Sequence, residues 1–221
     1  DQHSCALLED GTVRCWGYGL YGRLGYGNEE NIGDDETPAS AGPVPVGGKV
    51  KYIAAGSFHS CAVMEDGGLR CWGLGSNGQL GYANMNNIGD TEYPSTAGDV
   101  QIGANVESVA LGSLHTCVIL EGGAVRCWGN NADGVLGVPG TSQNMGDDEH
   151  PSTLSNVEIG SPALKIVAGA EHNCVLVGDA FDSVICWGFG ADSRLGTGVE
   201  GNVGDDETPA EGGVVKIYSE A

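Results

Sequence analysis

The chain repeats one pattern four times, and this periodicity constrains its fold more than any other feature. The tripeptide Cys-Trp-Gly begins at Cys15, Cys71, Cys127 and Cys186, in steps of 56, 56 and 59 residues. A His-x-Cys motif precedes each tripeptide, and an acidic motif that ends in proline follows it. Such a period indicates a repeat architecture. We therefore expect one domain over residues 1–221, with repeats at roughly 1–56, 57–112, 113–169 and 170–221.

Each copy contains short stretches that favour β-strands. In the second copy, residues 51–55, 60–64 and 68–72 are β-prone, and Glu65-Asp66-Gly67 is typical of a hairpin turn. Val44-Pro45-Val46 is typical of an edge strand, where proline is tolerated. No window of 11 residues shows helical periodicity. Four short strands make a propeller blade, so the sequence predicts an all-β fold, a β-propeller of four blades of about 56 residues.

The two ends of the chain are similar to adjoining parts of one repeat. Residues 215–221 match residues 50–56, and residues 1–5 match residues 57–61. This register predicts a circularly permuted propeller in which strands from both ends complete one blade. Head-to-tail contact between chains, giving a larger ring or an open filament, satisfies the same register, as does a cut from a longer tandem array. On this alignment the last copy lacks six residues between Pro209 and Val214.

The chain has eight cysteines, two in each copy. In a hairpin that turns at Glu9-Asp10-Gly11, Cys5 faces Cys15 at a Cα separation of about 4.5 Å, which a disulfide can span. The spacing is ten residues in three copies and twelve in the fourth, where the extra residues fall in the turn. We predict the structural disulfides Cys5–Cys15, Cys61–Cys71, Cys117–Cys127 and Cys174–Cys186. Each contributes about 2–3 kcal/mol, and together they indicate an oxidising compartment, so we expect a secreted, extracellular or cell-surface protein.

The recurring His-x-Cys motif raises a metal site as the rival interpretation of the cysteines. Zinc sites usually contain a close pair such as Cys-x2-Cys, which this chain lacks, so disulfides are favoured. We expect the histidines to satisfy backbone groups between blades, and a ring of histidines around a central channel is the alternative. The predicted repeat core comprises Trp16, Trp72, Trp128 and Trp187 with His3, His59, His115 and His172.

The chain is strongly acidic, with 30 aspartates and glutamates, nine lysines and arginines and a net charge of −21. Because clustered positive charge is what binds phosphates, this balance argues against nucleic acid and anionic membranes as partners. No apolar run approaches the roughly 18 residues of a membrane span, so no membrane insertion is expected. The charge suits a soluble surface, a cationic partner or divalent cations.

Four acidic loops carry 11 of the 30 acidic residues. They contain Asp34, Asp35 and Glu36; Asp90 and Glu92; Asp147, Asp148 and Glu149; and Asp205, Asp206 and Glu207. Calcium takes about six to eight oxygen ligands, so the loops are candidate calcium sites, although their spacing is not that of an EF-hand. The alternative, a solvated and mutually repulsive surface loop, is favoured. No other cofactor is expected.

The glycine-rich loops and the serines near histidines do not indicate catalysis. Gly17-x-Gly19-x-x-Gly22 matches the dinucleotide fingerprint, but no helix follows, and the third copy has Asn131 at the second glycine. Ser4 and Ser60 lie near histidines, but neighbouring side chains on a strand point to opposite faces. Since no nucleophile, base and orienting group come together, we expect no catalytic residues and no enzyme.

A longer motif joins these landmarks in the second copy: His59-Ser60-Cys61-Ala62-Val63, Leu69-Arg70-Cys71-Trp72-Gly73 and Gly78-Gln79-Leu80-Gly81. It resembles the regulator of chromosome condensation repeat, and the resemblance covers essentially the whole chain. The family implies a β-propeller, commonly of seven blades, from which four copies depart. Its founding member is a guanine-nucleotide exchange factor acting on chromatin, a role that does not suit an acidic chain with paired cysteines. The cysteine-bearing type is similar to bacterial secreted or surface repeat proteins, and a related secreted propeller inhibits β-lactamases through loops on one face.

These features give three functional hypotheses. The leading one is a secreted or cell-surface, non-enzymatic β-propeller that binds a protein partner or has a structural role. The first alternative is a subunit that joins further copies of itself into an extracellular ring or filament through head-to-tail strand complementation. The second alternative is a loop-mediated enzyme inhibitor. The fold alone does not decide among them.

Overall fold

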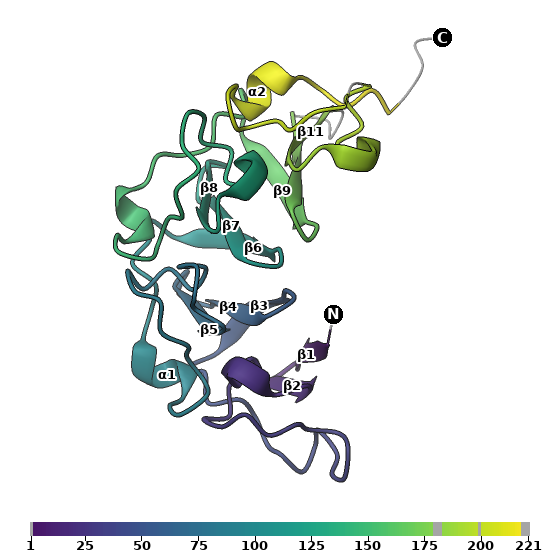
Figure 1. Ribbon diagram of the computed structural model, residues 1–221. Coiled ribbons are helices and arrows are strands. Elements are labelled where there is room, and N and C mark those ends of the chain that lie inside the picture. Colours follow the sequence, from purple (N-terminus) through teal and green to yellow (C-terminus); the bar gives the residue numbers. More distant parts are fainter. Residues whose placement is uncertain (1, 179–182, 199, 218–221) are drawn as a thin grey trace.

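Every repeat folds into an antiparallel β-sheet, and the four sheets stand side by side as blades in an arc (Figure 1). The computed structural model describes residues 2–178, 183–198 and 200–217. Blade 1 pairs β1 with β2, blade 2 has the order β3-β4-β5, blade 3 has β6-β7-β8, and blade 4 has β9-β10-β11. This arrangement confirms the predicted all-β, propeller-type fold.

The strands are short and alternate with tight turns. They are β1 (His3–Leu7), β2 (Val13–Gly17), β3 (Val50–Ala55), β4 (His59–Met64), β5 (Leu69–Gly73), β6 (Val106–Leu111), β7 (His115–Leu120), β8 (Val125–Gly129), β9 (Ala163–Ala168), β10 (His172–Val177) and β11 (Ser183–Gly188). The helical turns are η1 (Leu20–Gly22), α1 (Pro94–Ala97), η2 (Ala132–Gly134), η3 (Pro151–Thr153), η4 (Ala191–Ser193) and α2 (Pro209–Gly212). None of the helices in the described part of the chain is both long and apolar enough to cross a membrane.

The predicted hairpins form because their turn residues and strand periodicity agree. In the first hairpin, Leu8 N donates to Thr12 O, and Gly11 takes φ +82°, a conformation that glycine adopts without steric cost. The strands predicted at 51–55, 60–64 and 68–72 lie within one residue of the bounds of β3, β4 and β5. Residues 179–182, in the turn expected to hold the extra residues of the fourth copy, lie outside the described residues.

The expected fourth strand is reduced to a single contact. In blade 1, Val44 N donates to Val13 O over 2.8 Å, but Val46 N turns back to Val44 O. Pro43 and Pro45 have no N–H to extend the ladder, so residues 44–46 do not form an edge strand. The same position in blades 3 and 4 makes one isolated bridge each.

The C-terminal segment has a different register from the one expected. Val215 N donates to Val184 O, which is the outer position that Val44, Val100 and Val157 occupy in the other blades. Each of these valines lies six residues after the proline of its acidic loop, so the last copy lacks no residues there. The expected six-residue gap, and the assignment of Val215 to the first blade, are therefore wrong. Blade 1 has two strands within the described residues, and residues 218–221 lie outside them.

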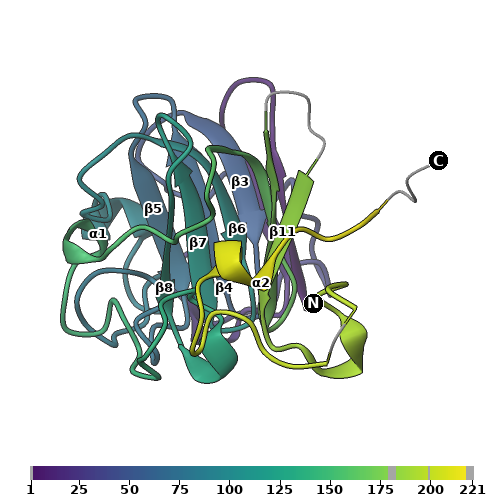
Figure 2. The ribbon, with the colours of Figure 1, turned by 90° about the horizontal axis from the view of Figure 1, so that it is seen from above.

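The apolar side chains are buried between neighbouring sheets. Seen from above, the strands of the blades lie roughly along one common axis (Figure 2). Trp72, Trp128 and Trp187 are fully buried, as predicted for the repeat core. Trp16 is only partly buried, since within the described residues no second blade packs on its side of blade 1. The blade interfaces, more than any single sheet, therefore hold the core together.

Candidate functional site

The cysteines form four disulfides, each of which joins the two strands of one hairpin. The bonds are Cys5–Cys15, Cys61–Cys71, Cys117–Cys127 and Cys174–Cys186, and each has a Cα–Cα distance of 4.1 Å. Every pair lies in direct cross-strand register, and no cysteine is free. The pairing predicted from spacing is the pairing of the structure, and it leaves no thiol for metal binding or nucleophilic chemistry.

The histidines and tryptophans form a repeated contact between blades, here called the blade joint. At the joint of blades 2 and 3, His59 Nε2 lies 2.8 Å from Thr116 Oγ1, and that hydroxyl donates to Gln79 O over 2.8 Å. Trp128 Nε1 donates to the same carbonyl over 3.0 Å. Two residues of blade 3 therefore donate to one backbone carbonyl of blade 2, and His59 of blade 2 forms a hydrogen bond with one of those two residues, Thr116.

The same geometry recurs at the other two joints with different side chains. Between blades 1 and 2, the contacts are His3 to Ser60, with Ser60 and Trp72 donating to Arg23 O. Between blades 3 and 4, they are His115 to Asn173, with Asn173 and Trp187 donating to Val135 O. His3, His59 and His115 lie between blades as expected, but they bind side chains, not backbone groups. The alternative, a ring of histidines around a central channel, stays a prediction.

The hydrogen bonds fix which histidine nitrogen carries the proton. Because the Thr116 hydroxyl proton is directed to Gln79 O, Thr116 can only accept from His59, so His59 Nε2 is the donor. The same reasoning applies to His3 with Ser60 and to His115 with Asn173. Nδ1 of both His3 and His59 is buried without a hydrogen-bond partner. A second proton would therefore be buried without an acceptor.

Burial lowers the pKa of these histidines from the ordinary 6.5 to about 4 for His3, about 3 for His59 and about 4 for His115. We expect the free energy of unfolding to be highest above pH 6.5 and to fall as the pH drops from 6.5 towards about 4. In that window the unfolded chain binds protons that the folded chain does not, and each histidine contributes up to about 1.4 kcal/mol per pH unit.

Urea midpoints measured at about pH 7.5, 6 and 5 test this pH dependence. A His59→Gln variant has one histidine fewer and should lose stability less steeply with acid than the unmodified chain. If the urea midpoints of the two proteins fell equally with pH, His59 would not be a buried histidine that stays neutral in the folded chain.

The joint also explains why the serines near histidines are not catalytic. Ser60 Oγ lies 2.8 Å from His3 Nε2, but the histidine donates to it, and the serine donates to Arg23 O. Ser60 is fully buried. A histidine that donates cannot act as the base for that hydroxyl, so this Ser–His pair is structural.

In the glycine-rich loops, the glycines allow close approach of backbone segments and do not form a phosphate site. A Cβ at Gly19 would lie 2.0 Å from Glu30 O, so the loop requires glycine for close approach of its own chain. Residues 20–22 then form only the short turn η1, and no helix follows. In the third copy Asn131 occupies the equivalent position and is buried.

Three of the four acidic loops bring their carboxylates together. The clusters are Asp34, Asp35 and Glu36; Asp147, Asp148 and Glu149; and Asp205, Asp206 and Glu207, each within 4.8 Å. Asp90 and Glu92 form no such cluster, and Thr91 between them donates to Glu92 Oε2 over 2.7 Å. A hydrogen bond with Asp35 raises the pKa of Glu36 above its ordinary value. Calcium binding by these loops stays a prediction.

A patch of aromatic side chains surrounds Arg23 at the joint of blades 1 and 2. The Arg23 guanidinium lies 5.2 Å from the ring centre of Tyr18, 5.6 Å from that of Tyr21 and 5.3 Å from that of Phe58. Arg23 is 1% exposed and donates to Leu20 O and, across the joint, to Ser57 O. Tyr18, by contrast, is 41% exposed. We call Tyr18, Tyr21 and Phe58 the aromatic patch.

Tyr21 holds a backbone conformation that favours glycine, asparagine or aspartate. Its φ is +65°, and the equivalent residues in the third and fourth copies are Asp133 and Asp192, at φ +58° and +59°. A bulky residue in this region is strained by about 1 kcal/mol or more. The patch is not among the sequence expectations, because its signal is a single copy with tyrosine where the other three have asparagine or aspartate at this turn.

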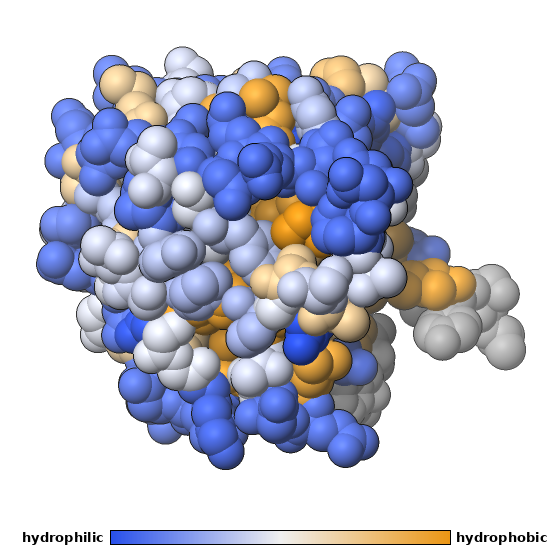
Figure 3. All heavy atoms as spheres, turned by 90° about the horizontal axis from the view of Figure 1, so that it is seen from below, coloured by the Kyte–Doolittle hydropathy of each residue, from blue (hydrophilic) through white to orange (hydrophobic). Residues whose placement is uncertain are grey.

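One side of the molecule has a mainly hydrophilic surface (Figure 3). Figure 3 shows one side of the molecule, on which hydrophilic residues cover most of the surface and hydrophobic residues form separate patches. A groove of about 780 Å³ beside the first acidic loop is lined by Tyr26, Tyr93 and the carboxylates of Glu30, Asp34 and Asp35, among others. This surface is suited to positively charged groups.

The chain matches two family profiles that are both described as the regulator of chromosome condensation (RCC1) repeat. One covers residues 10–63 and 66–119, and the other covers residues 50–79 and 106–135. The chain is 31% identical over 203 residues to the E3 ubiquitin-protein ligase HERC2 of Mus musculus, which is 91% of this chain and 4% of that protein. It is 30% identical over 197 residues to the ultraviolet-B receptor UVR8 of Arabidopsis thaliana, which is 89% of this chain and 41% of that protein.

Solved structures share the fold. Prp20p of Saccharomyces cerevisiae, described with its binding to Gsp1p and histones, superimposes with a TM-score of 0.71 at 21% identity, over 94% of this chain and 48% of that one. The entire ectodomain of the Physcomitrella patens receptor kinase CR4 gives a TM-score of 0.50 at 26% identity, over 87% of this chain and 40% of that one. This chain therefore spans less than half the length of each of these four proteins.

Proposed function

Since the chain belongs to the regulator of chromosome condensation repeat family, we propose that it is a protein-binding module, without enzymatic activity of its own, that works outside the cytosol. The observation that carries this proposal is that the recurring residues of the repeat hold the fold together, whereas variable residues are exposed. Groups that recur among the copies are used in joints and disulfides: three histidines and three tryptophans form the joints, and all eight cysteines form disulfides. Some of the side chains that differ among copies are exposed in the loops, such as Tyr18, which is 41% exposed.

The aromatic patch is the strongest candidate for the contact surface. Tyrosine and arginine are enriched among the residues that dominate protein–protein binding energies. Stacking on the buried Arg23 holds the rings in place, which reduces the entropy lost on binding. The strained backbone at Tyr21 supports a role for that side chain beyond folding, because aspartate would satisfy the turn with less strain.

Two observations support a location outside the cytosol. Four disulfides are rare in reducing compartments, since cytosolic thiols are kept reduced. One solved structure with the same repeat fold is a receptor kinase ectodomain. Trapping thiols in the source cells before lysis tests this part: we expect no labelled cysteine in this protein, and eight labelled cysteines would overturn it.

Assembly through head-to-tail strand complementation is not part of the proposal. It required residues 215–221 to act as the first strand of blade 1, and Val215 instead lies at the outer edge of blade 4. Enzyme inhibition is one form that protein binding could take, and the identity of the captured partner decides it.

The test of binding uses a variant that keeps the fold. Tyr18→Asn and Tyr21→Asp place at the patch the residues that the third copy carries at the equivalent positions, Asn130 and Asp133. We expect the double variant to unfold at the same or a higher urea concentration than the unmodified chain, because aspartate relieves the strain at φ +65°.

In capture from the medium or cell-surface fraction of the source cells, the unmodified chain should retain a specific protein that the double variant retains at least about tenfold less well. Leu8→Ser, at the hairpin turns on the opposite end of the strands, is the matched control and should retain the protein fully. Equal capture by all three proteins would show that the aromatic patch is not the contact surface. Absence of any captured protein would count against the module itself.

A further inference from the structure

Two arginines of this chain occupy the same place in their blades, here called the arginine slot. Arg23 Nε donates to Leu20 O over 2.9 Å, and Arg194 Nε donates to Ala191 O over 2.8 Å, at the equivalent turn of blade 4. Both guanidinium groups lie over an aromatic ring, at 5.2 Å from Tyr18 and 4.6 Å from Phe189. The repeat itself therefore builds a site for a guanidinium group at this turn.

In blade 1 the slot is completed by the next blade. Arg23 Nη1 donates to Ser57 O of blade 2 over 3.1 Å, and the Phe58 ring lies 5.3 Å from its guanidinium carbon. The slot thus has a floor formed by a turn carbonyl of one blade and a wall formed by two consecutive residues of the next.

Blade 3 builds the same slot but has Val135 at the position of the arginine. A cavity of about 70 Å³ remains there, and its lining includes Ala132, Asp133, Val135, Ala170 and Glu171, here called the blade 3 slot. Ala132 is equivalent to Leu20, whose carbonyl accepts from Arg23, and Ala170 is equivalent to Ser57. The two carbonyl positions that hold Arg23 in blade 1 are therefore present in blade 3. Each already accepts one backbone hydrogen bond, Ala132 O from Val135 N over 3.3 Å and Ala170 O from Ser113 N over 2.9 Å, and each has a second lone pair.

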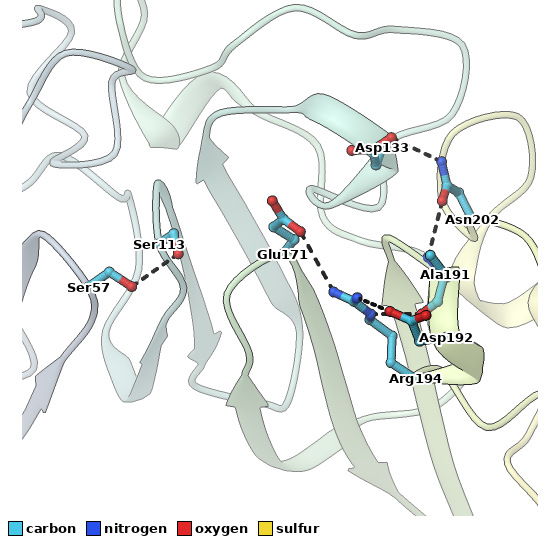
Figure 4. Close-up of polar contacts among 9 residues, drawn as sticks. Ser57, Ser113, Asp133, Glu171, Ala191, Asp192, Arg194 and Asn202 are labelled. Carbon is cyan, nitrogen blue, oxygen red and sulfur yellow. Dashed lines mark hydrogen bonds and ion pairs between the residues drawn. The ribbon is translucent and has the colours of Figure 1, made fainter. Parts of the chain in front are cut away.

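The side chains at the rim of the blade 3 slot are acidic where those around Arg23 are aromatic. Asp133 replaces Tyr21, and Glu171 replaces Phe58. Figure 4 shows Asp133 at the η2 turn and Glu171 on the neighbouring blade. Asp133 Oδ1 accepts one hydrogen bond, from Asn202 over 3.2 Å, and Glu171 Oε2 lies 3.7 Å from Arg194 Nη1. Both carboxylates are exposed and retain lone pairs for a further donor.

We propose that the blade 3 slot binds an arginine side chain of a partner protein, which takes the place that Arg23 fills in blade 1. The inference rests on the proposed function and names the chemistry of one contact. A guanidinium has five N–H donors in a planar fork, which suits one carbonyl at the floor, one on the wall and two carboxylates at the rim. An ammonium has three donors on a point charge and does not match this arrangement as well. The net charge of −21 attracts such a cationic partner.

The first experiment measures binding of a small probe to the purified, oxidised 221-residue chain. N-acetyl-L-arginine N-methylamide is titrated while backbone amide signals are followed by NMR, and uncharged N-acetyl-L-citrulline N-methylamide serves as its near-isosteric control. We expect saturable shifts at Asp133, Ala170 and Glu171 with the arginine probe, and binding weaker by roughly tenfold or more with citrulline. Equal responses to both probes, or shifts confined to the acidic loops, would overturn the proposal.

A matched pair of variants localises the site. Asp133 and Asp192 occupy the same turn position in blades 3 and 4 with nearly the same φ, and asparagine is tolerated at both. Asp133→Asn should weaken binding of the arginine probe several-fold, because it removes one rim carboxylate. Asp192→Asn lies outside the lining of the blade 3 slot and should weaken binding of the probe less, acting only through Arg194, which lies 3.7 Å from Glu171. If Asp192→Asn weakened binding of the arginine probe more than Asp133→Asn does, the proposed blade 3 slot would be contradicted.

The second experiment fills the slot from within. Val135 is 3% exposed, so an arginine there would ordinarily be strongly destabilising. In a slot built for guanidinium, Val135→Arg should instead unfold at a urea concentration no lower than that of Val135→Met, a control of comparable length, and should no longer bind the arginine probe. A Val135→Arg protein that is less stable than Val135→Met and still binds the probe would overturn the proposal.

These measurements need no natural partner. If the arginine probe does not bind the blade 3 slot, the protein-binding proposal is still tested separately by the capture experiment with the aromatic patch variant. If the probe binds but no protein is captured from the source cells, the slot is supported and the proposed function is not.

Discussion

Removal of the blade 2 disulfide, by the double substitution Cys61→Ala and Cys71→Ala, should lower the free energy of unfolding by about 2–4 kcal/mol. The bond closes a hairpin whose cysteines are ten residues apart, and it restricts the unfolded chain far more than the folded one. Both cysteines are fully buried, so the variant also loses packing contacts between blades. Urea unfolding of the two proteins under oxidising conditions measures the difference.

Full reduction provides the stronger form of the same test. With all four bonds broken, the summed loss approaches or exceeds the whole stability of an ordinary domain, so we expect the reduced chain to be unfolded at room temperature. A reduced chain that keeps its near-ultraviolet circular dichroism would show that the sheets do not depend on their disulfides. It would also weaken the inference about the compartment.

Trp128→Ala should destabilise the chain by about 3–5 kcal/mol, the usual range for a fully buried tryptophan. Trp128 fills the interface of blades 2 and 3 and donates to Gln79 O. Trp16→Ala is the matched control, because Trp16 has the same place in blade 1 but is only partly buried. We expect its effect to be less than half as large, measured by the shift in the urea midpoint.

Trp128→Phe separates the hydrogen bond from the packing. The ring remains, and Gln79 O still accepts from Thr116, so the loss should be closer to about 1–2 kcal/mol. If the Trp16 and Trp128 variants lost stability equally, the energy would reside within each sheet, and the blade joint would not be the main source of cohesion.

The features that the sequence predicts well are those set by local geometry. The strands around Cys61 and Cys71, their register and their disulfide follow from a turn signal and an even spacing, both of which lie within about a dozen residues. The burial of Trp72, Trp128 and Trp187 follows from the repeat, because a residue kept at one position in every copy has one environment in every interior blade.

The features that the sequence did not predict depend on contacts between copies. Ser60, Thr116 and Asn173 differ in type, and they share only the ability to accept from a histidine and donate to a carbonyl at once. The register expected for Val215 is wrong because similar apolar residues occur at both the outer and the inner position of a blade. Counting from Pro209 gives the observed register.

The blade joint has a consequence for how such chains change in length. Each joint takes its histidine and its carbonyl from one period and its hydroxyl or amide and its tryptophan from the next. A duplication or deletion of one whole period therefore carries both halves of a working contact with it, and no new surface has to arise by mutation. Gene rearrangements in units of this period would be tolerated far more readily than insertions of any other length.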